Sequence, residues 1–231
     1  MEWWTHLWLN EGFASFMEYL ATDAVYPNYN IFDTFVKNDF SMGMSLDALD
    51  SSHPIEVAVN HPSEVDEIFD HISYCKGSSV IRMLHSWIGD KNFRTGMSLY
   101  LNRHKYTNAL TEDLWAALEE ASEMPVGKVM STWTSQMNFP LVKVEKVSEK
   151  KIKISQKKFS ANGPGQKTEN DSLWHIPIQI CSSNKPQETV KTVVLDSQEM
   201  EIEFEEKADW YTEVLKKKPV NFSGQNTKKS F

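Results

Sequence analysis

The sequence predicts an α+β protein with more than one domain, mainly helical up to Phe139 and built from short antiparallel strands after it. Apolar residues recur every three or four positions in the first part and every second position in the second. The charge changes at the same place, because the first part has 8 Lys and Arg against 19 Asp and Glu, whereas the rest has 16 against 13. We therefore predict a domain boundary near residue 140.

The first two helices are predicted from apolar spacing and capping residues. Residues 11–23 carry an apolar face with three- and four-residue spacing, and Asn10 is the expected N-cap. Ser63, followed by acidic residues at the third and fourth positions, is the pattern of a capping box and predicts a helix over residues 63–72.

Three further helices are predicted in the rest of this part. A stripe of apolar residues over 80–88 predicts a helix that Gly89 ends. Thr111 is the expected cap of the next helix, and Pro125 is expected to begin the last one.

After Pro140 the apolar period of two predicts a small antiparallel β-sandwich over residues 140–215. Turn-rich stretches separate the alternating runs, as in a sandwich of short strands. Residues 216–231 are Lys-rich and polar, and we predict that they form a disordered tail. The expected strands are 141–147, 151–154, 176–180, 190–195, 201–205 and 210–214.

Composition narrows the possible partners and the compartment. The 231 residues are 40% hydrophobic and 24% charged, which is typical of a globular protein. The formal net charge of −8 argues against nucleic acid as a partner. No uncharged stretch is long enough for a membrane span and no signal peptide is evident, so we expect no membrane and a cytoplasmic location. Cys75 and Cys181 are too far apart for a disulfide framework.

Taken residue by residue, the chain shows no complete catalytic motif. No two of its seven histidines are four positions apart, so HExxH is absent, and there is no GxSxG nucleophile elbow. His71 and Cys75 have helical spacing, but two ligands do not make a metal site. We interpret them as a surface histidine beside a buried cysteine.

An ordered series of segments nevertheless resembles the gluzincin zinc aminopeptidases. The resemblance covers the chain to about Val214 and implies the distal, mainly helical part of a thermolysin-like catalytic domain over residues 1–139, followed by the β-sandwich. The segments are MEWWTHLWLNEGFA from Met1, SSHPIEV from Ser51, HPSEVDEIFD from His61, ISYCKGSSVIRML from Ile72 and TWTSQMNFP from Thr132.

The resemblance implies roles for two residues and a cofactor. In this family the Glu of the Asn-Glu-Gly-Phe-Ala segment is the third zinc ligand, which implies that Glu11 binds zinc. The Tyr of the Ser-Tyr-x-Lys-Gly segment donates to the oxyanion, which implies Tyr74 as the catalytic residue that stabilises the transition state. The implied reaction is the hydrolytic removal of N-terminal amino acids from peptides, in peptide catabolism. We interpret Lys76 and Arg82 as ordinary helix surface.

The same resemblance implies that this chain alone is inactive. The HExxH histidines, the general-base Glu and the Gly-Ala-Met-Glu-Asn segment, which binds the substrate amino group, are outside it. One carboxylate does not hold zinc at useful affinity. The alternative is a truncated, non-catalytic product that acts as a protein-binding module.

Overall fold

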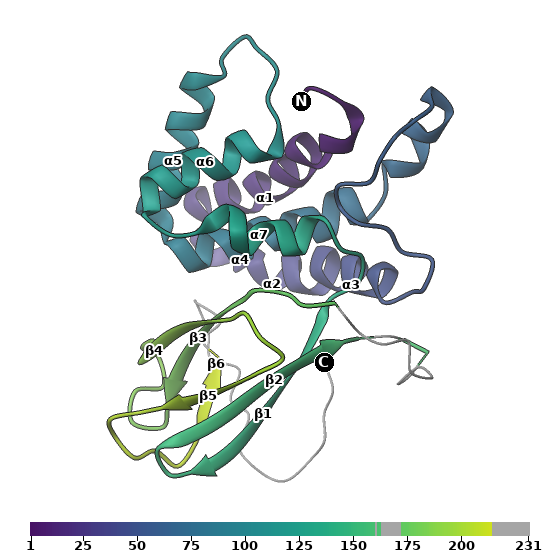
Figure 1. Ribbon diagram of the computed structural model, residues 1–231. Coiled ribbons are helices and arrows are strands. Elements are labelled where there is room, and N and C mark those ends of the chain that lie inside the picture. Colours follow the sequence, from purple (N-terminus) through teal and green to yellow (C-terminus); the bar gives the residue numbers. More distant parts are fainter. Residues whose placement is uncertain (160, 163–171, 214–231) are drawn as a thin grey trace. The chain divides into compact units, whose positions relative to one another are not determined.

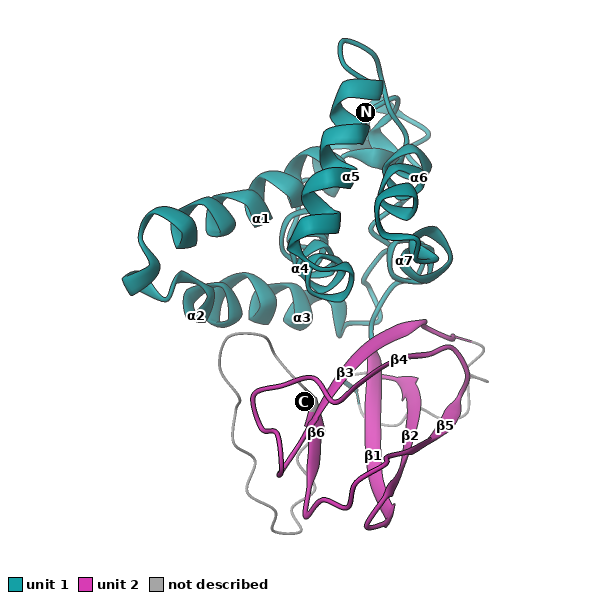
Figure 2. Ribbon diagram, turned by 90° about the vertical axis from the view of Figure 1, so that its left-hand side faces the viewer, with its two compact units in different colours: residues 1–139, 160–165 teal, residues 140–159, 166–231 magenta. Residues whose placement is uncertain are grey.

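The computed structural model describes residues 1–159, 161–162 and 172–213. In Figures 1 and 2 the chain divides into two compact units, residues 1–139 with 160–165 and residues 140–159 with 166–231. Helices make up the first unit and antiparallel strands the second, so the α+β class is confirmed. The predicted tail, 216–231, lies outside the described residues.

The first unit is a set of packed helices. None of the helices in the described part of the chain combines the length and the apolar character needed to cross a membrane. In chain order they are η1 (Trp4–His6), α1 (Trp8–Val25), η2 (Pro27–Tyr29), α2 (Ile31–Phe35), η3 (Val36–Phe40), α3 (Ser41–Asp47), η4 (Pro62–Ile68), η5 (Ile72–Lys76), α4 (Gly77–Ile88), α5 (Asp90–Arg103), α6 (Thr111–Ser122) and α7 (Val126–Thr134).

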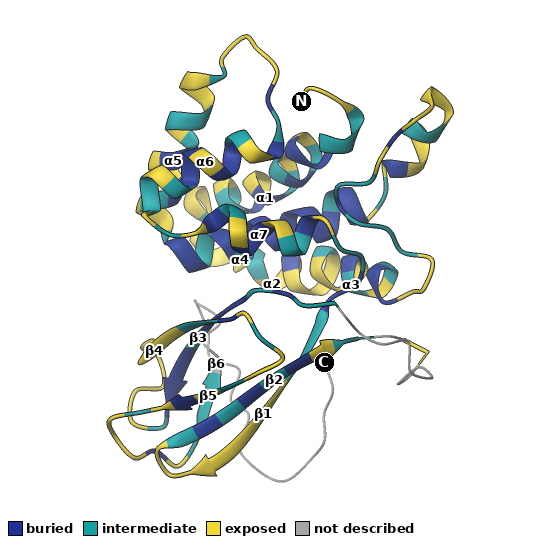
Figure 3. Ribbon diagram, in the orientation of Figure 1, coloured by how far each residue is buried: buried dark blue, intermediate teal, exposed yellow. Residues whose placement is uncertain are grey.

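Helix α4 is the most strongly amphipathic element of the first unit and follows its prediction. Its apolar stripe is buried, as Figure 3 shows for the dark-blue positions along the helix. Gly89 ends it with φ 82°, a left-handed conformation that glycine adopts without steric cost. The helices predicted to begin at Thr111 and Pro125 are also present as α6 and α7.

The predicted caps are wrong at three helices. Helix α1 begins at Trp8, so Asn10 lies inside it and Leu7 holds the cap position. In place of one helix over residues 63–72, the 3₁₀ helix η4 spans Pro62–Ile68 and the π-helix η5 begins at Ile72. His61 is the cap of η4 and accepts from the Ser63 amide. Thr111 is the first helical residue, Leu110 holds the cap position, and the Thr111 hydroxyl accepts from the buried Trp8 indole at 3.2 Å.

The described residues of the second unit form two three-stranded antiparallel sheets, in the orders β1-β2-β5 and β4-β3-β6. Gln156 joins them, because its side-chain amide donates to the Trp174 carbonyl at 2.8 Å and accepts from the Trp174 amide at 3.0 Å. All six predicted strands are present. They are β1 (Pro140–Ser148), β2 (Lys151–Lys158), β3 (Ile176–Ser182), β4 (Lys191–Leu195), β5 (Glu199–Glu203) and β6 (Tyr211–Glu213).

Candidate active-site residues

The structure brings Glu11 and Tyr74 together, although they are distant in the sequence. Glu11 lies in the first turn of α1, and Tyr74 is the central residue of the π-helix η5. Burial raises the pKa of the Tyr74 phenol, and the hydrogen bond and negative charge of Glu11 raise it further. Tyr74 therefore keeps its proton at neutral pH and can donate it in a hydrogen bond. π-Helical turns are frequent at functional sites.

Two glycines allow α1 to approach η5 this closely. A Cβ atom on Gly12 would lie 3.1 Å from the Gly77 carbonyl carbon and 3.2 Å from the Ser73 carbonyl oxygen. Gly12 follows Glu11, and Gly77 begins α4 directly after η5. The contact is between backbones, so a side chain at Gly12 cannot be accommodated by a change of rotamer alone.

Gly12→Ala is expected to lower the free energy of unfolding by about 1–3 kcal/mol, the usual cost of overpacking a core. Urea unfolding of the purified chain measures this loss. The control is Gly127→Ala, where the added Cβ meets the Trp115 Cβ at 3.4 Å and alanine favours the helix by about 0.5–1 kcal/mol. Equal losses in the two variants would contradict a specific close approach at Gly12.

Asp70 holds the start of η5. One oxygen of its carboxylate accepts from the backbone amides of Ile72 at 2.8 Å and Ser73 at 3.1 Å. The other oxygen is 2.9 Å from His53 Nε2, and His53 Nδ1 is 2.7 Å from the Pro54 carbonyl oxygen. Because both ring nitrogens face acceptors, this arrangement favours the doubly protonated imidazolium.

The pKa shifts of this pair follow from those contacts. The hydrogen bond to Asp70 raises the pKa of His53, with a smaller contribution from the Pro54 carbonyl, and together they outweigh the effect of burial. Burial favours a higher pKa for Asp70, but the bonds from His53 and from the two amides outweigh it, and the net pKa is lowered.

The His53–Asp70 pair is expected to stabilise the fold most between pH 3.8 and 6.5, the ordinary pKa values of the two groups. The raised His53 pKa gives a contribution that is complete below 6.5 and is lost as pH rises through the folded-state value. The lowered Asp70 pKa gives one that is complete above 3.8 and is lost as pH falls. Urea unfolding of the wild type and His53→Gln between pH 5 and 9 should show a stability difference that shrinks at high pH. A pH-independent difference, or one that persists in the Asp70→Asn background, would contradict this.

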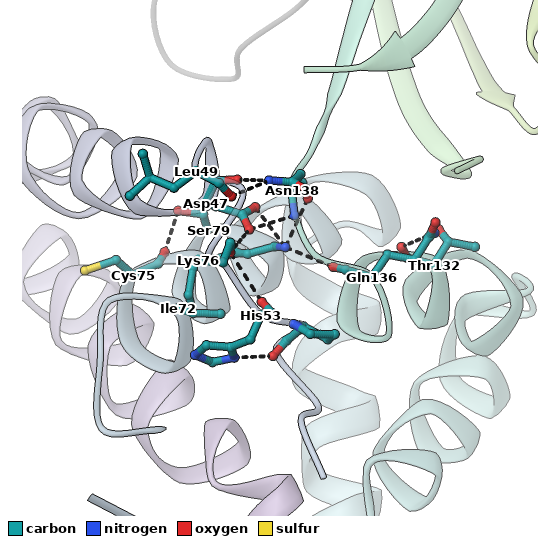
Figure 4. A network of polar contacts seen from close by, with 12 residues as sticks. Asp47, Leu49, His53, Ile72, Cys75, Lys76, Ser79, Thr132, Gln136 and Asn138 are labelled. Atoms are coloured by element: carbon teal, nitrogen blue, oxygen red, sulfur yellow. Dashed lines mark hydrogen bonds and ion pairs between the residues drawn. The ribbon is translucent and has the colours of Figure 1, made fainter. Parts of the chain in front are cut away.

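Lys76 lies at the centre of a buried polar network rather than on the surface, so that prediction is wrong. Its ammonium group is 2.8 Å from the Asp47 carboxylate and 3.1 Å from the carbonyl oxygens of Gln136 and Asn138 (Figure 4). Asp47 also accepts from the Asn138 amide at 2.8 Å and from the Ser52 hydroxyl at 2.7 Å. The network ties the end of η5 to α3 and to the segment after α7.

Arg82 is only partly exposed, so its interpretation as ordinary helix surface is also wrong. Its guanidinium group lies over the rings of Phe32 and Phe35, 5.2 and 5.1 Å from their centroids. Burial lowers the pKa of Arg82. The side chain therefore packs α4 against α2.

An open hollow of about 450 Å³ lies beside Tyr74. Asp39, on the π-helix η3, accepts hydrogen bonds from the Tyr19 hydroxyl and the Cys75 thiol next to it. Burial raises the pKa of Cys75 to about 11, with Asp39 adding to the shift, so Cys75 is a neutral thiol. The Cys75 sulfur lies 3.6 Å from His71 Nδ1. Cys75 is buried and His71 is exposed, so the interpretation of the two as a surface histidine beside a buried cysteine is confirmed. The hollow is lined by Ser15, Asp39, Leu46, Phe69, Asp70, His71, Tyr74 and Cys75.

The described residues do not by themselves bring together the ligands of a zinc site. Among the residues that the structure describes, no three His, Cys, Asp or Glu side chains gather so that they could hold a metal ion. Glu11 is therefore one implied ligand without neighbours of the kind that a His₂Glu site requires.

Comparison with known proteins decides the family. Residues 1–133, more than half of the chain, match the Peptidase family M1 domain. The chain belongs to peptidase family M1. Glu11, Tyr74, His53, Asp70 and Asp47 all lie within the part that matches the M1 domain, whereas Gln136 and Asn138 follow it.

The M1 relatives are much longer proteins that carry aminopeptidase names. Aminopeptidase M1 of Arabidopsis thaliana is 50% identical over 182 residues, which cover 78% of this chain and 20% of the relative. The puromycin-sensitive aminopeptidase of Caenorhabditis elegans is 42% identical over 208 residues, 89% of this chain and 22% of the relative. Glutamyl aminopeptidase of Bos taurus is 43% identical over 194 residues, 82% and 20% of the two chains. The chain thus spans about a fifth of the length of these curated relatives.

The sequence alone did not identify His53, Asp70, Asp47 and Asp39 as residues that bond to η5, directly or through one another. The signal available for Asp70 was its position just before η5, where a carboxylate accepts the first amides of a helical turn. The pairing of Asp47 with Lys76 and of His53 with Asp70 joins separate elements, and spacing along one element does not predict it.

Proposed function

We propose that this chain is the distal helical part of an M1 aminopeptidase catalytic domain, residues 1–139, followed by its β-sandwich, residues 140–215. Glu11 supplies a zinc ligand and Tyr74 a hydrogen-bond donor to the oxyanion. The observation that carries the proposal is the proximity of Glu11 and Tyr74, with Gly12 and Gly77 in backbone contact beside them. The proposed reaction is the removal of N-terminal amino acids from peptides.

The two residue types suit these roles. The Tyr74 phenol is protonated at neutral pH, as tyrosines ordinarily are, and burial raises its pKa further. It can therefore donate to the oxygen on which negative charge develops when a peptide carbonyl is attacked. A donor that acts mainly in the transition state raises the rate more than it tightens substrate binding.

We place the protein in the cytoplasm. Both cysteines are free and buried, which fits that reducing compartment.

We propose that the chain by itself is inactive, because its sequence contains neither HExxH nor the Gly-Ala-Met-Glu-Asn segment. The purified chain should contain less than stoichiometric zinc and should not release an amino acid from a chromogenic aminoacyl amide. Stoichiometric zinc with turnover that a chelator abolishes would overturn this.

A chimera tests the enzyme proposal itself. The segment of the C. elegans enzyme that aligns with this chain is replaced by the chain's own residues, 42% identical over 208 positions. The chimera should bind one zinc ion and turn over, Glu11→Gln should lose most of the zinc, and the control Glu18→Gln, exposed on the same helix, should keep it. Retained zinc in Glu11→Gln would contradict the ligand role. A folded chimera without zinc or turnover would favour the alternative, a non-catalytic binding module.

A further inference from the structure

The turn that carries Tyr74 is attached at its start to one residue, Asp70. The Asp70 carboxylate accepts from the amides of Ile72 and Ser73, and its backbone carbonyl accepts from the Tyr74 amide at 3.1 Å. Three consecutive amides of η5 therefore bond to Asp70. The backbone that carries the Tyr74 side chain is therefore bonded directly to this residue.

Asp70 is held in turn by His53, which lies in the loop between α3 and η4. The two side chains are each about a quarter exposed, and their ion pair is 2.9 Å long. The Pro54 carbonyl fixes the other edge of the imidazole at 2.7 Å. His53 thus connects a separate loop to the start of η5.

The charged and titratable groups near the His53–Asp70 pair come from η5, α3 and η3. The positive charge of Lys76, on η5, disfavours a positive charge on His53. The Asp47 carboxylate, on α3, lies 2.8 Å from the Lys76 ammonium group and compensates its charge. On the other side are the thiol of Cys75, whose pKa the negative charge of Asp70 helps to raise, and Asp39 on η3, which faces that thiol. His71, next to Asp70 in the chain, is exposed. The nearest opposite charge to each member is therefore the other member of the pair.

Resting on the proposed function, we propose that His53 and Asp70 are positioning residues for Tyr74. Their ion pair holds the Asp70 carboxylate against the first amides of η5 and so fixes the direction in which the Tyr74 hydroxyl points. Removal of the imidazole leaves the carboxylate free to turn toward water and loosens the turn. The expected consequence is a slower reaction with unchanged substrate affinity.

The first test uses the chain itself and needs no activity. The Tyr74 ring signal in NMR spectra of tyrosine-labelled chain is assigned by its loss in Tyr74→Phe. It should shift with pH in a step shared with the His53 imidazole, above pH 6.5, and His53→Gln should abolish that step. His71→Gln should leave it in place, which separates His53 from the histidine nearer in sequence. A Tyr74 signal that does not follow His53, or that follows it equally in Asp70→Asn, would overturn the proposal.

The second test is a double-mutant cycle in the chimera. His53→Ala should lower kcat on the order of 10- to 100-fold, the usual range for a misplaced catalytic group, with KM and zinc content unchanged. In the Tyr74→Phe background the same substitution should lower kcat less than about threefold, because its effect passes through the lost hydroxyl. His53→Gln, which keeps a donor to Asp70, should restore part of the rate. His104→Gln, on the loop after α5, is the control and should not change kcat.

The cycle also separates the two proposals. If Tyr74→Phe alone leaves kcat unchanged, the oxyanion role fails and the positioning role fails with it. If Tyr74→Phe lowers kcat but the His53→Ala effect has the same size in both backgrounds, only the positioning role is wrong. A His53→Ala chimera that has lost its fold is replaced in the cycle by Asp70→Asn.

Discussion

Asp47→Ala is expected to lower the free energy of unfolding of the helical unit by about 3–5 kcal/mol, because it leaves the Lys76 ammonium buried without its counter-charge. The side chains of Lys76 and Asp47 are only 7% and 2% exposed. Burial lowers the pKa of Lys76, and Asp47 works against that shift. The same substitution removes the acceptor for the Asn138 amide, which adds an unsatisfied buried donor. Urea unfolding at neutral pH measures the loss.

Two controls distinguish an uncompensated charge from a lost contact. Asp47→Leu combined with Lys76→Met removes both charges, and the loss should be much smaller than in the single variant. Arg94→Ala breaks the exposed pair with Asp90, where the side chains are 66% and 54% exposed, and should cost no more than about 1 kcal/mol. A double variant as unstable as Asp47→Ala would contradict the explanation by buried charge.

Regular apolar periods predicted the fold well where packing uses large side chains. The stripe along α4 and the alternation in the second unit gave elements of the right type, because burial on one face requires those periods. Strand β1 is the exception within its sheet. It alternates in sequence, yet Val144 and Val147 are 56% and 51% exposed, so the alternation predicted the strand but not the burial of its apolar residues.

Helix α5 was missed, and its packing explains why. Phe93 and Gly96 are its buried residues, and a Cβ on Gly96 would lie 2.7 Å from a Leu118 methyl carbon. A helix that packs through a glycine shows little apolar periodicity, so the sequence offers no stripe to detect. Residues 31–47 were missed for a related reason, since they are broken into α2, η3 and α3 with few buried positions.

The candidate site was predictable only as far as the resemblance extended. The resemblance implied the roles of Glu11 and Tyr74 individually. The residues that bond to the turn around Tyr74 lie in other segments of the chain, which the resemblance did not connect with it. Lys76 illustrates the limit, because a lysine beside a helix start is usually exposed, and only the fold places Asp47 against it. Since Lys76 is two residues after Tyr74, the network at one end of η5 and Asp70 at the other constrain the same turn.

Tyr74→Phe in the chimera is expected to lower kcat by about 10²–10³-fold, the usual cost of removing one oxyanion donor, or roughly 3–4 kcal/mol of barrier. The substitution removes one hydroxyl from a half-buried ring and leaves the backbone of η5 and its bonds to Asp70 intact. Because the hydroxyl is proposed to act mainly in the transition state, KM should change little. Steady-state kinetics on an aminoacyl amide, with zinc measured on the same sample, gives both quantities.

The control for that experiment is Tyr100→Phe, a partly buried tyrosine on α5 whose pKa is raised by burial and by Asp113 rather than by Glu11. It should leave kcat unchanged. Loss of zinc in Tyr74→Phe would show that the hydroxyl supports the Glu11 carboxylate instead of the oxyanion, since the two groups interact in this structure. A kcat within about threefold of the parent chimera, with zinc intact, would contradict the oxyanion role, because removing a true oxyanion donor should lower kcat by at least about 10²-fold.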